Sequence, residues 1–116
     1  MRKPISRAQL LARDSRPLSG GGYSQTEIDA QLSELPGWSQ REGAIERSYA
    51  FGDYYETIAF VNGLVWMVHG EDHHPELVVG YNRCTVRFST HSVGGISEND
   101  FICAAKTDAV FGRSGN

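Results

Sequence analysis

Three stretches of the chain space their apolar residues as a helix does. Residues 24–27 read Ser-Gln-Thr-Glu, a capping box in which the serine side chain accepts from the third helical N–H and the glutamate reaches back. This pattern predicts a helix that continues to about Leu35 and ends at Pro36-Gly37. Similar caps at Asp53 and at residues 97–100 predict a long helix to about Gly70 and a last helix near the C-terminus.

Two other stretches alternate polar and apolar residues, as half-buried strands do. Residues 38–51 alternate on both sides of Glu42-Gly43, which predicts a hairpin. Residues 77–79 and 84–89 predict two further strands, joined by a turn. The order is therefore α-β-β-α-β-β-α. It is typical of an α+β fold, with a four-stranded antiparallel sheet and helices packed on one face.

The long central helix is apolar on more than one side. One apolar stripe consists of Ile58, Val61, Val65 and Val68. A second, separate stripe consists of Phe60, Leu64 and Met67. A helix of this kind needs more than one surface to pack against, such as its own sheet and a partner subunit. A chain of 116 residues also buries a modest share of its surface by itself. We therefore expect a homodimer or a homotetramer.

Charge is distributed unevenly along the chain. Residues 1–22 contain five basic residues and only Asp14 as an acid, although the whole chain has a net charge of -3. The acidic remainder argues against direct nucleic-acid binding, which needs a clustered basic face. We interpret residues 1–22 as a basic flexible tail rather than a partner-binding arm. The glycine run at 20–22 then marks the boundary of a domain over residues 23–111, followed by a C-terminal tail at 112–116.

The two cysteines, Cys84 and Cys103, form no CxxC pair and are expected to be small core residues in a reducing compartment. The longest apolar stretch, residues 61–68, is interrupted and far too short to span a bilayer. Residues 1–22 also lack the apolar region of a secretory signal. We expect a cytoplasmic protein without a membrane partner.

All four histidines fall between positions 69 and 91, near the ends of predicted elements. Histidine exchanges protons near neutral pH, so the cluster is compatible with acid-base catalysis, but also with exposed polar residues at loop edges. A metal site at His69 and His73 is the weaker alternative, because the sequence between them is not an HExxH pattern. The chain also lacks a GxSxG nucleophile elbow and a phosphate-binding Walker lysine.

The spacing of these residues resembles the signature of the pterin-4a-carbinolamine dehydratase family. That signature begins with a polar residue, which is followed after three intervening residues by a His-His-Pro triplet. An aromatic residue, a histidine and an acidic residue come after the triplet. The matching positions here are His69, His73-His74-Pro75, Tyr81, His91 and Asp100. The resemblance extends from about Leu32 to Asp108 and leaves the N-terminal 22 residues outside it.

The resemblance implies a function as well as a fold. It implies that the chain removes water from 4a-hydroxytetrahydrobiopterin, a pterin-4a-carbinolamine left by aromatic amino-acid hydroxylases, and releases quinonoid dihydropterin. No cofactor and no metal are expected, because the pterin is the substrate. By analogy, His73 and His91 form the acid-base pair, and His74 holds the pterin ring. Pro75 disfavours helical geometry at His74 and so fixes an irregular segment there.

Further residues are expected to bind the substrate. Thr90 and Ser92, on either side of His91, are able to donate to ring heteroatoms. Asp100 either orients a histidine or supports the cap of the last helix, and the sequence leaves both roles open. Two positions depart from the family pattern: His69 stands where an acidic residue is common, and Leu77 where an aromatic residue is common.

The family also includes non-catalytic relatives, so a binding or assembly role is the alternative to catalysis. Some relatives are dimerisation cofactors of transcription factors, and others assist Rubisco assembly in carboxysomes. Fold alone does not separate these roles. The partners that the resemblance implies are the small-molecule pterin and either a hydroxylase or, in the alternative assembly role, Rubisco.

Overall fold

A computed structural model describes residues 1–18 and 20–113 of the chain. Their order confirms the α-β-β-α-β-β-α succession and adds one helix before it and a short 3-10 turn after the last strand. The elements are α1 (Arg7–Ala12), α2 (Gln25–Leu32), β1 (Ser39–Arg41), β2 (Ala44–Ala50), α3 (Tyr54–Glu71), β3 (Glu76–Val79), β4 (Arg83–Phe88), η1 (His91–Val93) and α4 (Glu98–Arg113).

The local signals for helix starts and turns are confirmed. The Ser24 side chain accepts from the Glu27 N–H, and the Glu27 side chain reaches back to the Ser24 N–H. At the start of α3, the Asp53 side chain accepts from the Glu56 N–H. The predicted hairpin turns at Glu42 and Gly43, whose φ angles of 48° and 80° give the two successive left-handed residues of a tight β-hairpin.

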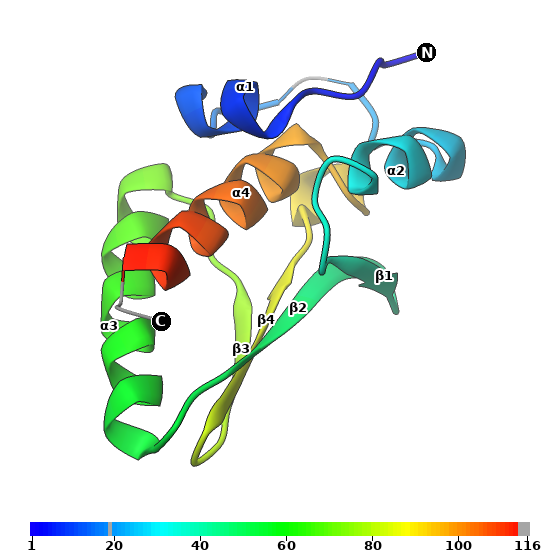
Figure 1. The fold of residues 1–116 in the computed structure, drawn as a ribbon. Coiled ribbons are helices and arrows are strands. Elements are labelled where there is room, and N and C mark those ends of the chain that lie inside the picture. The colour runs from blue at the N-terminus through cyan, green and yellow to red at the C-terminus, as the bar shows by residue number, and fades with distance from the viewer. Residues whose placement is uncertain (19, 114–116) are drawn as a thin grey trace.

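The four strands form one antiparallel sheet in the order β1-β2-β4-β3, which leaves β1 and β3 at the edges. Helices α3 and α4 cover one face of this sheet (Figure 1), as the sequence predicts. The core between the layers is largely aliphatic and aromatic. Its fully buried side chains include Phe60 and Leu64 from α3, Val86 and Phe88 from β4, and Phe101 from α4.

Both cysteines belong to this core, as expected. Cys84 and Cys103 are buried and free. Burial raises the pKa of the Cys84 thiol to about 11 and that of Cys103 to about 12, so both stay protonated thiols near neutral pH.

The N-terminal segment differs from the flexible tail that the sequence predicts. Residues 1–18, here called the N-terminal arm, pack on the domain, and α1 lies across α4 (Figure 1). The Ser6 and Gln9 side chains form a capping box at the start of α1. Leu10 is fully buried, and the backbone N–H and C=O of Ile5 both bond to the buried Gln31 amide, at 2.8 Å each.

Asp108 connects this arm to the sheet. Its carboxylate forms an ion pair with Arg7 of the arm at 2.9 Å and with Arg47 of β2 at 3.0 Å. The Trp38 indole N–H and the Tyr49 hydroxyl also donate to it. Burial and the bond to Asp108 raise the pKa of Tyr49 far above its usual range, so Tyr49 remains a donor. A carboxylate with four donors around it is well compensated for its burial.

At the other end of the chain, α4 continues to Arg113, so Gly112 and Arg113 are helical rather than part of a tail. Residues 114–116 of the expected tail lie outside the described residues. Among residues 1–18 and 20–113, no helix is long and apolar enough to cross a membrane.

The packing of the arm is tested by two adjacent leucines. Leu10 is fully buried, whereas Leu11 is 40% exposed. We expect Leu10→Ala to lower the free energy of unfolding by about 2 to 4 kcal/mol, because it leaves a cavity against α4. Leu11→Ala should change it by less than about 0.5 kcal/mol. Urea unfolding followed by circular dichroism measures the free energy of unfolding of both variants. Equal, small effects of the two substitutions would contradict the packing of the arm and support a flexible tail.

Candidate active site

Asp100 lies in the first turn of α4 and has no exposed surface. One of its oxygens, Oδ2, accepts from the Ser97 N–H at 2.8 Å and from the Thr90 hydroxyl at 2.8 Å. The Ser97 hydroxyl in turn accepts from the Asn99 N–H at 3.2 Å. Ser97 and Asp100 thus stabilise the start of α4 in the manner of a capping box, and the anion lies at the positive end of the helix.

The other oxygen of Asp100 binds a histidine. His73 Nε2 lies 2.5 Å from Asp100 Oδ1. His73 follows Asp72, which ends α3 in a left-handed conformation with φ 52°, so the chain turns sharply toward α4 at this point. The His73 ring also stacks on Phe88, with 5.9 Å between ring centroids and 10° between planes. Asp100 therefore supports the cap and orients a histidine, the two roles that the sequence left open.

The protons in this network follow from the types of group. With Asp100 ionised, both of its oxygens only accept, so His73 Nε2 carries a proton. The Thr90 hydroxyl gives its single proton to Asp100, so the hydroxyl of Ser97, 2.6 Å away, donates to Thr90. The remaining His73 nitrogen, Nδ1, is then an acceptor in the neutral ring. His73 is thus held in one tautomer with one nitrogen available for proton transfer.

A cavity of about 230 Å³ opens beside this pair, and we call it the His73 cavity. Its lining comes from the domain and from residues 15–18 of the arm. The lining residues from the domain are Glu71, Asp72, His73, Thr90, Ser92 and Asn99. Three residues that the sequence assigned to substrate binding, His73, Thr90 and Ser92, therefore share one cavity.

His74 and Pro75 lie elsewhere. They line a second cavity with His69 and Leu77, between the end of α3 and the edge strand β3. This cavity also measures about 230 Å³ and is largely apolar. His73 and His74 are adjacent in the chain, but their side chains face different cavities, because neighbouring residues in an extended segment point to opposite sides.

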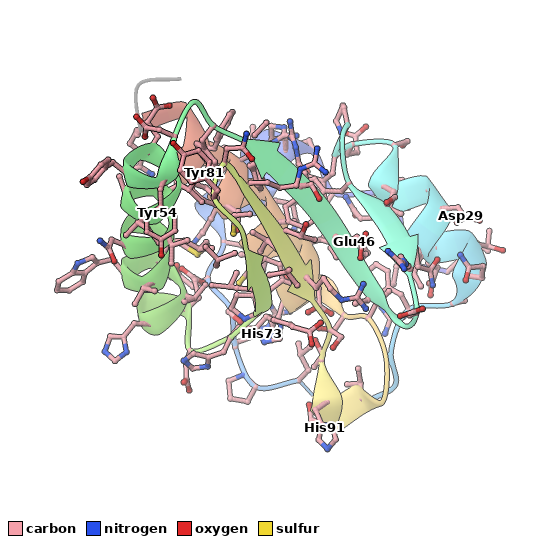
Figure 2. The ribbon with its side chains drawn as sticks, turned by 90° about the horizontal axis from the view of Figure 1, so that it is seen from below. Asp29, Glu46, Tyr54, His73, Tyr81 and His91 are labelled. Atoms are coloured by element: carbon pink, nitrogen blue, oxygen red, sulfur yellow. The ribbon has the colours of Figure 1, made fainter. Side chains whose placement is uncertain are left out.

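His91 is exposed at the start of η1. Figure 2 shows His73 and His91 at the same end of the molecule, with the His91 ring pointing outward and Tyr81 at the opposite end. In residues 1–18 and 20–113, neither the His74 side chain nor the His91 side chain forms a hydrogen bond or an ion pair. Tyr81 stacks instead on Tyr54, with 6.3 Å between ring centroids.

The described ranges, 1–18 and 20–113, contain no group of three or more histidine, cysteine, aspartate or glutamate side chains arranged to hold a metal ion. His69 and His73 in particular do not converge, because they line different cavities.

The contribution of residues 15–18 and of Asn99 to the His73 cavity is not predicted from the sequence. The basic character of residues 1–22 hid a weaker signal, the Ser6-to-Gln9 capping box followed by the apolar pair Leu10-Leu11. That pattern is typical of a short amphipathic helix and indicates a packed segment.

A four-stranded antiparallel sheet covered on one face, with a carboxylate-oriented histidine in a polar cavity, defines an α+β protein suited to proton transfer. The sequence profile of the pterin 4 alpha carbinolamine dehydratase family matches residues 22–110. The chain belongs to this family.

Relatives agree with this assignment. A protein of Bdellovibrio bacteriovorus, named "Putative pterin-4-alpha-carbinolamine dehydratase", is 54% identical over 113 residues, which cover 94% of this chain and 93% of its own. Residues 1–22 are about a fifth of the chain, so this alignment includes most of the N-terminal arm.

Two solved structures share the fold. A Brucella melitensis protein described as a transcriptional coactivator/pterin dehydratase is 33% identical, with a TM-score of 0.74 over 78% of this chain and 98% of its own. A pterin dehydratase-like protein described as a RuBisCO assembly factor in the alpha-carboxysome has a TM-score of 0.58 over 67% of this chain and 93% of its own. At 23% identity, the second likeness concerns the fold alone.

The tautomer of His73 is open to a direct test. In Asp100→Asn, the side-chain oxygen should stay with the Ser97 N–H, which is only able to donate, and the amide NH₂ should face His73. His73 must then accept at Nε2 and carry its proton on Nδ1. Nitrogen-15 NMR of the imidazoles should show Nε2–H in the wild type and Nδ1–H in the variant, with His91 unchanged. The same His73 tautomer in both proteins would contradict the assigned network.

Proposed function

We propose that the protein dehydrates 4a-hydroxytetrahydrobiopterin to quinonoid dihydropterin by histidine acid-base catalysis, without a metal or an organic cofactor. The observation that carries this proposal is the His73 pair with buried Asp100 at the wall of a polar cavity, in a chain of the dehydratase family. Nucleic acid is not a proposed partner, since the chain is acidic overall.

The reaction needs two proton transfers. The C4a–O bond breaks, the leaving hydroxide takes up a proton and departs as water, and N5 loses a proton so that a C4a–N5 double bond forms. Both transfers suit imidazole, whose ordinary pKa lies near neutral pH. No oxidant or reductant takes part, which agrees with a site made of histidine, carboxylate and hydroxyl groups.

His73 is the first of the two acid-base groups in this proposal. Its Nδ1 accepts a proton in the neutral ring, and Asp100 stabilises the imidazolium that results. Stacking on Phe88 keeps the ring in place between the two states. His91 is the second group, at the same end of the molecule and next to Thr90 and Ser92.

His74 and Pro75 have a different part, because they line the second cavity. We assign them to binding the pterin ring rather than to proton transfer. The two cavities flank one backbone segment, residues 73–75, so a ligand that extends past this segment contacts both. Replacement of His74 should therefore raise KM more than it lowers kcat.

Replacement of the acid-base pair gives the decisive test. His73→Ala and His91→Ala should each lower kcat for dehydration by roughly 100-fold or more, the usual contribution of a positioned acid or base. The assay follows dehydration of enzymatically generated 4a-hydroxytetrahydrobiopterin by absorbance, relative to the reaction in buffer. Ser89→Ala is the matched control, because Ser89 is exposed next to Thr90 but lies outside the His73 cavity. If the wild-type rate equals the buffer rate, the proposal fails.

We also propose that the chain forms a homodimer or a homotetramer. Trp66 and Val65 on α3 are 80% and 50% exposed, and Val78 and Val79 on the edge strand β3 are 60% and 40% exposed. An open strand edge with apolar side chains favours pairing with a second copy.

The apolar surface of α3 offers a test of self-association. Trp66→Glu should reduce the molar mass measured by light scattering, because an interface would bury the new charge without a partner. Circular dichroism should stay unchanged, since Trp66 is exposed in the single chain. A wild-type protein that is already monomeric would contradict this proposal and leave the catalytic one standing.

A further inference from the structure

The N-terminal arm passes directly over the candidate active site. Residues 15–18 line the His73 cavity together with His73, and Pro17 and Leu18 add apolar surface to the polar groups of Ser15 and Arg16. Without this segment the cavity would lose one wall and open to solvent. Partial enclosure matters for a proton-transfer site, because excluding water strengthens the electrostatic contacts inside it.

The arm is held at this place by residues that adjoin Asp100 and His73 in the sequence. Asn99, which precedes Asp100, forms a reciprocal pair with the backbone of Arg16: its Oδ1 accepts from the Arg16 N–H at 3.2 Å, and its Nδ2 donates to the Arg16 C=O at 2.7 Å. Glu71, two residues before His73, accepts from the Ser15 N–H at 2.7 Å. All three bonds fix the backbone of the arm rather than its side chains.

Charge adds to this attachment. Arg16 and Arg13 both form ion pairs with Glu98, at 2.9 and 3.3 Å. Burial raises the pKa of Glu98, but the hydrogen bond and charge of Arg16, supported by Arg13, outweigh burial and hold that pKa below its usual range. Asn99 itself is only 6% exposed, so its amide needs the Arg16 backbone as a partner.

The arm lies outside the part of the chain that the family profile describes. That profile matches residues 22–110. The alignment with the Bdellovibrio bacteriovorus relative covers 94% of this chain and so includes most of residues 1–22.

We propose that residues 15–18 are a substrate-contacting wall of the active site and that Asn99 is the positioning residue that holds this wall in place. The wall contacts the reduced pterin bound beside His73 and thereby sets its affinity. This inference rests on the proposed function, in that the ligand it names is the pterin carbinolamine.

Two variants loosen the wall by different routes. Asn99→Ala removes the pair with Arg16, and Leu10→Ala weakens the anchor of α1 at a site outside the cavity. Both should raise KM for the carbinolamine by about 10-fold, a factor that corresponds to about 1.4 kcal/mol, with kcat changed much less. Arg2→Ala and Leu11→Ala are the controls, because they alter the same arm away from the cavity. Hydrogen exchange at residues 13–18 verifies that the wall has been released.

A second readout does not depend on catalysis. Diethyl pyrocarbonate acylates neutral imidazoles, and mass spectrometry gives its rate at each histidine. His73 should react faster in Asn99→Ala and in Leu10→Ala than in the wild type, because the arm shields a side chain that is only 13% exposed. His69, His74 and His91, all exposed, are internal references with unchanged rates.

The outcomes separate the two proposals. An active wild type whose KM stays the same after release of the wall overturns the arm proposal and leaves the dehydratase function intact. An inactive wild type overturns the proposed function, and the acylation rates of His73 then test the arm proposal. Faster acylation of His73 in the two variants than in the wild type supports a covering wall, and equal acylation overturns it.

Discussion

A carboxylate removed from water must find donors, and the partners of Asp100 determine how the active end of this protein is built. The side chain has no exposed surface, yet it bonds to His73, Thr90 and the Ser97 N–H. These partners come from the end of α3, from the end of β4 and from the start of α4. One buried charge thus connects all three elements, and loss of any donor would leave it poorly compensated.

The same helix carries a second compensated carboxylate at its other end. Asp108 receives donors from the arm, from β2 and from Trp38, so α4 is connected at both ends to segments that are distant in the sequence. The two carboxylates have different roles. Asp108 contributes to the assembly of the fold, whereas Asp100 also fixes the tautomer and orientation of a histidine. The fixed tautomer and orientation leave one nitrogen of His73 available for proton transfer.

The arm and the His73–Asp100 pair are connected through sequence neighbours. Asn99 binds the arm and precedes Asp100, and Glu71 binds the arm two residues before His73. Movement of the arm therefore acts on the same short segments that position His73 and Asp100. The family profile begins at residue 22, so the arm lies outside the part of the chain that it matches. Leu10 of the arm is fully buried, and residues 15–18 line the His73 cavity, so the arm contributes both to the core and to the lining of this cavity.

The sequence by itself determined the α+β fold, because each helix start and turn is encoded by residues only a few positions apart, such as Ser24 with Glu27 and Glu42 with Gly43. Through the resemblance to the dehydratase signature it also indicated His73 and Asp100, and it indicated Thr90 and Ser92 as neighbours of His91. Only the tertiary structure decided that the basic segment packs, that Asp100 has both of its possible roles, and that His73 and His74 face different cavities. Those facts depend on contacts such as His73 with Asp100 and Arg16 with Asn99, 27 and 83 residues apart. Such contacts arise from how whole elements pack, which no local pattern of residues records.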